Sequence, residues 1–246
     1  MTPGPTLDDR VAIFSDVHAN LPALEVVLAD IDAAGINALY CGGDLVGYGP
    51  HPNEVCALIE DLAIPTIYGN YDYAIARELE DCGCAYITQH DRDLGQQSVD
   101  WTLAHTGQRA KDFMRELPFD LRFAVGDRDV HLVHGSPRKV NEYLFEDKPA
   151  RLYERLARAE AADVLVFGHT HKPWTHVYGD VLFANSGSVG KPKDGDPRAC
   201  WIELRPADAF VEVVRHRVEY DADAVADEVR AAGLPTEFAD KLMLAA

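Results

Sequence analysis

The stretch that decides the fold is VAIFSDVHANLPALEVVLADIDAAGINALYCGGD, residues 11–44. The apolar runs at 11–15 and 38–41 are typical of short buried strands. Between them, apolar residues recur at helical spacing over 22–35, with Pro22 near the start and Gly35 at the end. A helix over 53–62, with Asn53 as its expected N-cap, and a strand over 65–68 continue the pattern. This β-α-β-α-β alternation predicts a largely parallel sheet in an α/β fold.

The remainder of the chain is expected to belong to the same domain, which would span residues 1–246. Residues 74–118 are mostly helical in pattern and are expected to form a cap insertion. Strands at 121–126, 128–133 and 164–168 enclose a helix at 149–162. Four strand candidates between 176 and 218, separated by turn signals, predict an antiparallel or mixed second sheet. The tail, 219–246, reads as two short helices.

Composition places the chain among ordinary globular proteins, with 246 residues, 47% of them apolar and 26% charged. No apolar run approaches the roughly 18 residues of a membrane span, and the first ten residues lack the pattern of a signal peptide. Five cysteines without a C-x-x-C pair favour reduced thiols over a disulfide framework. These features predict a cytoplasmic location.

The charge balance limits the partners that the surface can attract. The 23 basic and 41 acidic residues give a formal charge of −18, so we expect neither non-specific nucleic-acid binding nor membrane binding. A small phosphorylated substrate would need a local positive site to overcome this field. The pattern carries no signal for an oligomeric state.

Residues that can bind metal ions follow five predicted strands at the point where each strand ends. Each short motif alone is commonplace, but the carboxyl ends of strands in α/β sheets form the ligand site. Glycines beside the motifs let the backbone approach such a site closely. Together the motifs predict a metal centre built from Asp16-Val17-His18, Gly43-Asp44, Gly69-Asn70-Tyr71-Asp72, His134-Gly135 and Gly168-His169-Thr170-His171.

This array resembles the calcineurin-like metallophosphoesterase superfamily, with its D-x-H, G-D, G-N-H-[DE], H-G and G-H-x-H motifs. The resemblance covers roughly residues 10–204, and the segments 46–55 and 185–199 are similar to small bacterial and archaeal phosphodiesterase-like members. It implies two mixed β-sheets packed as a sandwich flanked by helices, in four layers. It also implies a ligand set: Asp16, His18 and His171 for one metal, Asn70, His134 and His169 for the other, and Asp44 bridging them.

The chemistry of these residues agrees with two divalent ions as cofactors. Imidazole with carboxylate or amide oxygen suits Mn, Fe, Zn, Co or Ni better than Mg or Ca alone, and we expect Mn. Four positive charges against the carboxylates of Asp16 and Asp44 would leave the local positive site that the acidic surface lacks. The resemblance implies a phosphoesterase that cleaves small phosphodiesters by attack of a metal-bridging hydroxide.

The sequence departs from the family pattern at Tyr71, where the family has a histidine thought to protonate the leaving group. Asp72, the acidic residue expected to orient that group, is retained. Tyrosine has an unperturbed pKa near 10 and is a poor general acid at neutral pH. We therefore expect good leaving groups, as in aryl or cyclic nucleotide esters. Asn70 and Arg138 are candidate substrate contacts, and His51 is a conceivable substitute acid.

Other activities remain open on the sequence. They are a phosphomonoesterase, a phosphatase of the protein-serine/threonine or dinucleoside-polyphosphate type, and a scaffold left catalytically weak by Tyr71. Against the scaffold, all seven metal-ligand positions are intact.

Overall fold

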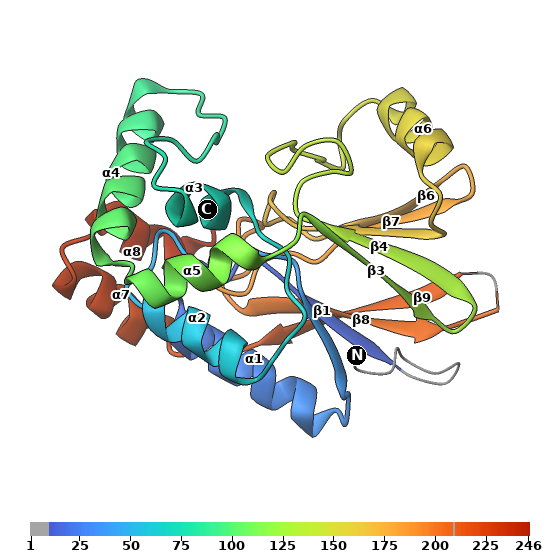
Figure 1. Ribbon diagram of the computed structural model, residues 1–246, viewed down its shortest axis with the longest axis horizontal. Coiled ribbons are helices and arrows are strands. Elements are labelled where there is room, and N and C mark those ends of the chain that lie inside the picture. The colour runs from blue at the N-terminus through green and yellow to red at the C-terminus, as the bar shows by residue number, and fades with distance from the viewer. Residues whose placement is uncertain (1–9, 209) are drawn as a thin grey trace.

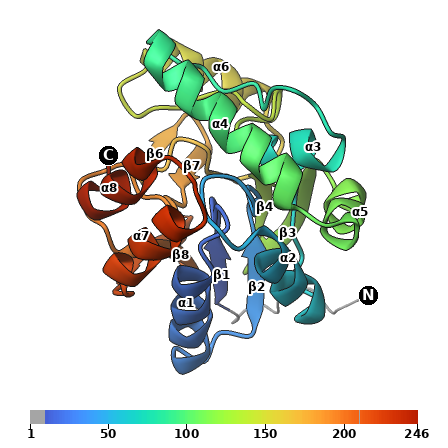
Figure 2. The same ribbon diagram turned by 90° about the vertical axis from the view of Figure 1, so that its left-hand side faces the viewer.

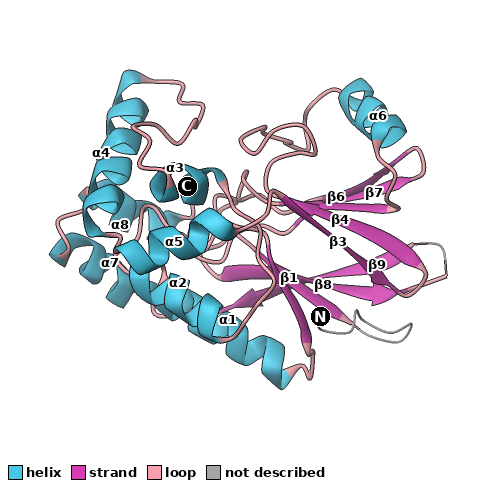
Figure 3. Ribbon diagram, in the orientation of Figure 1, coloured by secondary structure: helices cyan, strands magenta, loops and turns pink. Residues whose placement is uncertain are grey.

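Two stacked mixed β-sheets form the centre of the computed structural model, which describes residues 10–208 and 210–246 (Figures 1 and 3). The first sheet has the order β2-β1-β8-β9 and the second β3-β4-β5-β7-β6. The first is built from β1 (Val11–Phe14), β2 (Ala38–Cys41), β8 (Ala199–Pro206) and β9 (Val211–Val218). The second is built from β3 (Asp120–Val125), β4 (Arg128–Val133), β5 (Val164–Phe167), β6 (Thr175–Tyr178) and β7 (Val181–Asn185).

Parallel pairs stand at the centre of the second sheet and at the β2 edge of the first, where the central pair β1–β8 is antiparallel. Strand β1 is parallel to β2, and β5 is parallel to both β4 and β7, while the other pairs are antiparallel. The carboxyl ends of the parallel strands lead into the loops at the helical end of the molecule (Figure 3). The expected sandwich of two mixed sheets flanked by helices is confirmed.

Helices flank the two sheets and the ends of their strands. They are α1 (Leu21–Ala33), α2 (Pro52–Asp61), α3 (Asn70–Ala76), α4 (Gln89–His105), α5 (Gln108–Glu116), α6 (Ala150–Ala159), α7 (Ala222–Ala231) and α8 (Thr236–Leu244). Helix α6 packs on the second sheet, and α1 and α2 pack on the first. Within the described ranges, no helix combines the length and the apolar character that crossing a membrane requires.

Strand β1 shows why the sandwich needs apolar residues on both faces. Successive side chains of a strand point to opposite sides, and all four residues of β1 are fully buried. Val11 and Ile13 join the core between the sheets, whereas Ala12 and Phe14 join the core under α1 and α2. The strand is therefore fixed from both sides, and so is the loop that follows it.

Two expectations for the segment that follows β2 are wrong. Residues 65–68 do not form a full strand, since only Thr66 bridges to Cys41, in the parallel sense. Asn53 does not cap α2, because the helix already begins at Pro52. The Asn53 side chain instead contacts the end of α4, where it donates to the His105 carbonyl oxygen and accepts from the Gly107 N–H.

The later strands divide between the sheets, which corrects the expectation that all of them build the second. Strands β6 and β7 do so, but β8 pairs antiparallel with β1 and β9 pairs with β8. Pairing partners depend on packing across the molecule, and local strand pattern does not specify them.

The helical cap segment and the tail meet each other beside the sheet ends. The 74–118 segment contains the end of α3, a loop over 77–88, and helices α4 and α5. Leu94 of α4 lies in one apolar cluster with Val225 of α7 and Phe238 of α8. In Figure 2, α4 and the α7–α8 pair lie on either side of the loops that follow the strands.

Replacing Trp201 of β8 tests the core that holds β1 in place. Trp201 is fully buried, donates from Nε1 to Asp30, and stacks on His216 at 3.8 Å. We expect Trp201→Ala to lower the free energy of unfolding by about 3–5 kcal/mol, the range for large aromatic truncations. Denaturant titration would measure it, with Leu62→Ala as control because Leu62 is 54% exposed. Equal effects of both changes would contradict this account of the core.

Candidate metal centre

All seven predicted metal ligands converge at the carboxyl edge of the two sheets. Each residue is at most 3% exposed. Asp16 and His18 follow β1 and Asp44 follows β2, while Asn70 begins α3. His134 follows β4, and both histidines of the His169-Thr170-His171 segment follow β5. Segments from both sheets therefore contribute to one buried polar centre.

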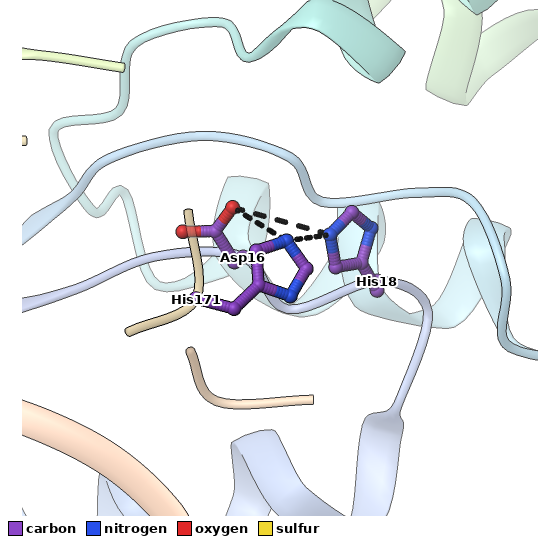
Figure 4. A group of neighbouring side chains, drawn as sticks. All are labelled: Asp16, His18 and His171. Atoms are coloured by element: carbon purple, nitrogen blue, oxygen red, sulfur yellow. Dashed lines mark hydrogen bonds and ion pairs between the residues drawn. The ribbon is translucent and has the colours of Figure 1, made fainter. Parts of the chain in front are cut away.

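The first group consists of Asp16, His18 and His171 (Figure 4). The Nε2 atoms of His18 and His171 lie 3.1 Å apart, and the His171 Nε2 lies 3.3 Å from Oδ1 of Asp16. The side chains point toward one another, from loops 153 residues apart in the chain. One cation among these three atoms would contact all of them.

The second group consists of Asp44, His134 and His169. Oδ2 of Asp44 lies 3.4 Å from Nε2 of His134 and 3.7 Å from Nε2 of His18, so this carboxylate faces both groups. Asn70 joins the second group, with Oδ1 at 3.2 Å from the His134 Nε2. This is the arrangement expected of a bridging Asp44.

Three of the histidines each have a backbone carbonyl oxygen as the hydrogen-bond acceptor for Nδ1, which leaves Nε2 to face the centre. The Nδ1 atoms of His18, His134 and His171 face the carbonyl oxygens of Val46, Gly42 and Lys191 at 3.1, 2.8 and 2.5 Å. A proton on Nδ1 leaves a bare lone pair on Nε2 of a neutral imidazole. The Nε2 atoms of His18 and His171 then oppose each other without a proton between them. The buried Nε2 of His169 has no hydrogen-bond partner among the described residues.

The ionisable groups respond to burial and to one another as metal ligands would. Burial lowers the pKa of His18 to about 3, and it also lowers the pKa values of His169 and His171. Burial acts in the same direction on His134, but the Asp44 carboxylate raises its pKa to about 10. Burial thus favours the neutral imidazole at His18, His169 and His171, which is the form in which histidine binds a metal.

The backbone at the ligands is unusual. Asp16, His18, Asp44, His169 and His171 all have positive φ, between 50° and 62°. Such a conformation costs a residue with a side chain on the order of 1 kcal/mol, and the surrounding structure must compensate for it. Five strained residues in one buried cluster mark a functional site.

Gly168 and Gly69 allow the backbone to approach the carboxylates. A Cβ on Gly168 would lie 2.4 Å from Oδ2 of Asp16, and one on Gly69 would lie 2.0 Å from Oδ1 of Asp44. Both carboxylates also accept backbone hydrogen bonds, Asp16 from the His169 N–H and Asp44 from the Tyr71 N–H. A side chain at either glycine would therefore collide with a candidate metal ligand.

The two cysteines of Cys82-Gly83-Cys84 contribute to the centre by positioning Asn70. The Asn70 Nδ2 donates to the Cys82 carbonyl oxygen at 2.9 Å and to Cys84 Sγ at 3.3 Å. These contacts turn Oδ1 toward His134. Sequence reasoning missed this role, because the C-x-C spacing carries no signal for it.

Tyr71 and Asp72 are buried, and each is engaged in other contacts. The Tyr71 hydroxyl donates to Ser98 of α4 at 3.2 Å, and burial raises its pKa well above the ordinary value. Asp72 accepts from the N–H groups of Gly69 and Leu45 at 2.9 and 2.8 Å. Both carboxylate oxygens of Asp72 are thus engaged by backbone, and its expected role in catalysis stays a prediction. A catalytic role for Tyr71 stays a prediction.

Two further candidate residues are held away from the centre. Arg138 forms an ion pair with Glu142 and is not among the residues that line the cavity. The His51 Nε2 lies 2.9 Å from Glu228 of α7. Arg138 as a substrate contact and His51 as a substitute acid stay predictions, and in this structure each side chain is engaged by a glutamate.

A cavity of about 280 Å³ opens onto the metal ligands. Aromatic residues line one part of it, including Tyr48, Tyr86, Tyr143 and Phe145. Three lysines also line it: Lys191 and Lys193 from the segment after β7, and Lys241 from α8. Sequence reasoning missed Lys193 and Lys241, and Lys241 reaches the cavity only because the tail packs α8 beside it.

Replacing Gly168 tests whether the close approach to Asp16 holds the first ligand group. We expect Gly168→Ala to weaken metal binding by about 10–100-fold, the usual effect of disturbing groups that position ligands. Calorimetric titration of metal-free protein with Mn²⁺ would measure it. Gly107→Ala is the matched control, since its new Cβ meets only Asn53 Oδ1, at 3.2 Å. Unchanged affinity in a folded Gly168→Ala protein would contradict the assignment.

Comparisons with known proteins agree with the fold. Residues 10–205 match the model of the calcineurin-like phosphoesterase superfamily domain. A metallophosphoesterase structure from Sphaerobacter thermophilus is similar with 32% identity and a TM-score of 0.77, over 97% of this chain and 100% of that chain. An uncharacterized protein of Methanocaldococcus jannaschii is 31% identical over 95% of this chain and 97% of its own length. The phosphodiesterase YfcE of Escherichia coli K12 is 29% identical over 76% of this chain and 83% of its own length.

The match to the family model spans most of the chain, from β1 to the end of β8, and includes all seven ligand positions. Members of this family are phosphoesterases, which are hydrolases, and they normally bind divalent metals. The chain belongs to the calcineurin-like phosphoesterase superfamily.

Proposed function

We propose that the protein is a dinuclear metal-dependent phosphodiesterase that hydrolyses small phosphodiesters with good leaving groups. One observation carries the proposal: two adjoining ligand groups, Asp16-His18-His171 and Asp44-His134-His169, share the Asp44 carboxylate. Two divalent ions held side by side suit the hydrolysis of phosphate esters. Mixed nitrogen and oxygen donors favour Mn, Fe, Zn, Co or Ni, and Mn is our first candidate.

The metal ions would supply acidified water and would neutralise charge on the phosphoryl oxygens. Backbone groups of the chain fix the positions of the side chains that would hold the ions. Backbone carbonyls fix three imidazoles through Nδ1, and the N–H groups of Tyr71 and His169 hold the two carboxylates. These contacts preorganise the centre, so that little rearrangement accompanies the reaction.

The size of the cavity and the state of Tyr71 support a small diester as the substrate. A volume of about 280 Å³ lies at the lower end of the range for small-molecule sites, roughly 300–1,000 Å³. The Tyr71 hydroxyl is bonded to Ser98, and its raised pKa makes it a weak proton donor. Esters whose leaving group departs as an anion need no such donor. The relative YfcE is itself named a phosphodiesterase.

Replacing Asp44 tests the shared carboxylate. We expect Asp44→Asn to lower Mn-dependent hydrolysis of bis-p-nitrophenyl phosphate by about 100-fold or more, because loss of one ligand charge disrupts both ion positions. Release of p-nitrophenol would be measured, with Asp112→Asn, an exposed carboxylate paired with Arg115, as control. If wild-type protein binds Mn²⁺ without hydrolysing this diester or p-nitrophenyl phosphate, the protein is a scaffold and the proposal fails.

Replacing Tyr71 tests the leaving-group preference. We expect Tyr71→His to raise kcat on diesters with alkyl leaving groups by about 10–100-fold, with little gain on aryl esters, because a general acid matters most for poor leaving groups. A plot of log kcat against leaving-group pKa would show a shallower slope for this variant.

Tyr71→Phe is the matched control, since it keeps the ring and removes the hydroxyl that donates to Ser98. It should retain the wild-type slope. A slope that steepens in Tyr71→Phe would instead identify the tyrosine hydroxyl as a proton donor. Mn²⁺ content and thermal unfolding would verify that both variants fold.

A further inference from the structure

With two divalent ions bound, the cavity would hold more positive charge than the single negative charge of a simple phosphodiester could neutralise. Two divalent ions against Asp16 and Asp44 already exceed the single charge of a phosphodiester. Lys191, Lys193 and Lys241 line the same cavity in addition. The protein has a formal charge of −18, so three lysines at one cavity indicate a site for an anionic ligand.

Among the residues that the structure describes, no carboxylate pairs with any of the three lysines. None of them forms an ion pair with an aspartate or glutamate of residues 10–208 and 210–246, whereas Lys111 on α5 pairs with Glu78 at 2.8 Å. Asp91 lines the cavity too, but its carboxylate accepts from the Thr88 hydroxyl at 2.6 Å. Burial lowers the pKa values of Lys191 and Lys193, so an anion bound in the cavity would favour their charged forms, and no carboxylate among the described residues competes for their ammonium groups.

The lysines differ in how firmly the fold holds them. Lys191 is 7% exposed, and its ammonium group lies 4.6 Å from the centre of the Tyr48 ring. The Lys193 N–H donates to the carbonyl oxygen of His171 at 3.3 Å, which ties this lysine to a metal-ligand loop. Lys241 projects from α8, a helix held against α4 and α7 by a shared apolar cluster. The ligand loop and the tail helix thus each contribute a cation beside the metal centre.

We propose that Lys193 and Lys241, with Lys191 behind them, form a subsite for a second anionic phosphate group of the substrate. This inference rests on the proposed phosphodiesterase function and narrows it: the scissile phosphate faces the metal ligands, and a second phosphate on the same molecule faces the lysines. Lysine ammonium groups bind phosphate through charge-assisted hydrogen bonds. The preferred substrate is then a diester that carries a second phosphate, and the tail helix acts in substrate selection.

A matched pair of substrates separates the subsite from the reaction. Thymidine 5′-(p-nitrophenyl phosphate) and its 3′-phosphorylated counterpart have the same leaving group and differ only in the second phosphate. We expect the wild-type protein with Mn²⁺ to show a kcat/KM about tenfold or more higher for the 3′-phosphorylated compound, roughly the effect of one charged hydrogen bond. In the double variant Lys193→Met/Lys241→Met, the ratio should fall toward one.

Lys148→Met is the control, because Lys148 is exposed and does not line the cavity. It should retain the wild-type ratio. No preference in the wild type, or an undiminished preference in the double variant, would overturn the subsite while the phosphodiesterase activity stood.

Binding of inorganic pyrophosphate to metal-free protein gives a readout that does not depend on turnover. At fixed ionic strength, calorimetry should show weaker binding to the double variant than to the wild type by about tenfold. If neither thymidine compound is hydrolysed but this difference appears, the proposed reaction fails and the anion subsite stands. Equal binding to both proteins would overturn the subsite.

Discussion

The structure depends on one electrostatic constraint: buried histidine nitrogens and carboxylate oxygens approach one another closely. Several of these atoms carry lone pairs and no proton, so they repel one another. The Nε2 atoms of His18 and His171 are 3.1 Å apart although both imidazoles carry their proton on the far side. Lone pairs in such contact repel unless a cation lies between them. A cation between these atoms would relieve this repulsion, as expected of a candidate metal centre.

The rest of the fold can be understood as the framework that imposes this arrangement. Parallel strands from two sheets end at a common edge, and β1 is fixed by cores on both faces. Positive φ angles turn five ligands inward, and Gly168 and Gly69 admit the backbone beside the carboxylates. The strain at these residues is offset by burial elsewhere, as is usual where a site must be preorganised.

Six of the seven candidate ligands could be predicted from sequence because each follows β1, β2, β4 or β5, whereas Asn70 begins α3 after a segment that forms only one bridge. The surroundings could not, since they depend on tertiary packing. Strand β8 joins the first sheet by pairing with β1, and α8 reaches the cavity because Phe238 packs with Leu94. Arg138 looked available in sequence, yet Glu142, four residues on, engages it. The positions of Lys193 and Lys241 and the hydrogen bond of Tyr71 to Ser98 had no local signal.

Two cations that lie side by side in this centre and share Asp44 would be magnetically coupled. The most direct measurement is electron paramagnetic resonance of metal-free protein titrated with Mn²⁺. We expect each chain to take up two ions and, at full loading, to give the multiline spectrum of an exchange-coupled Mn²⁺ pair. Uptake of a single ion, or two ions with independent spectra, would contradict it.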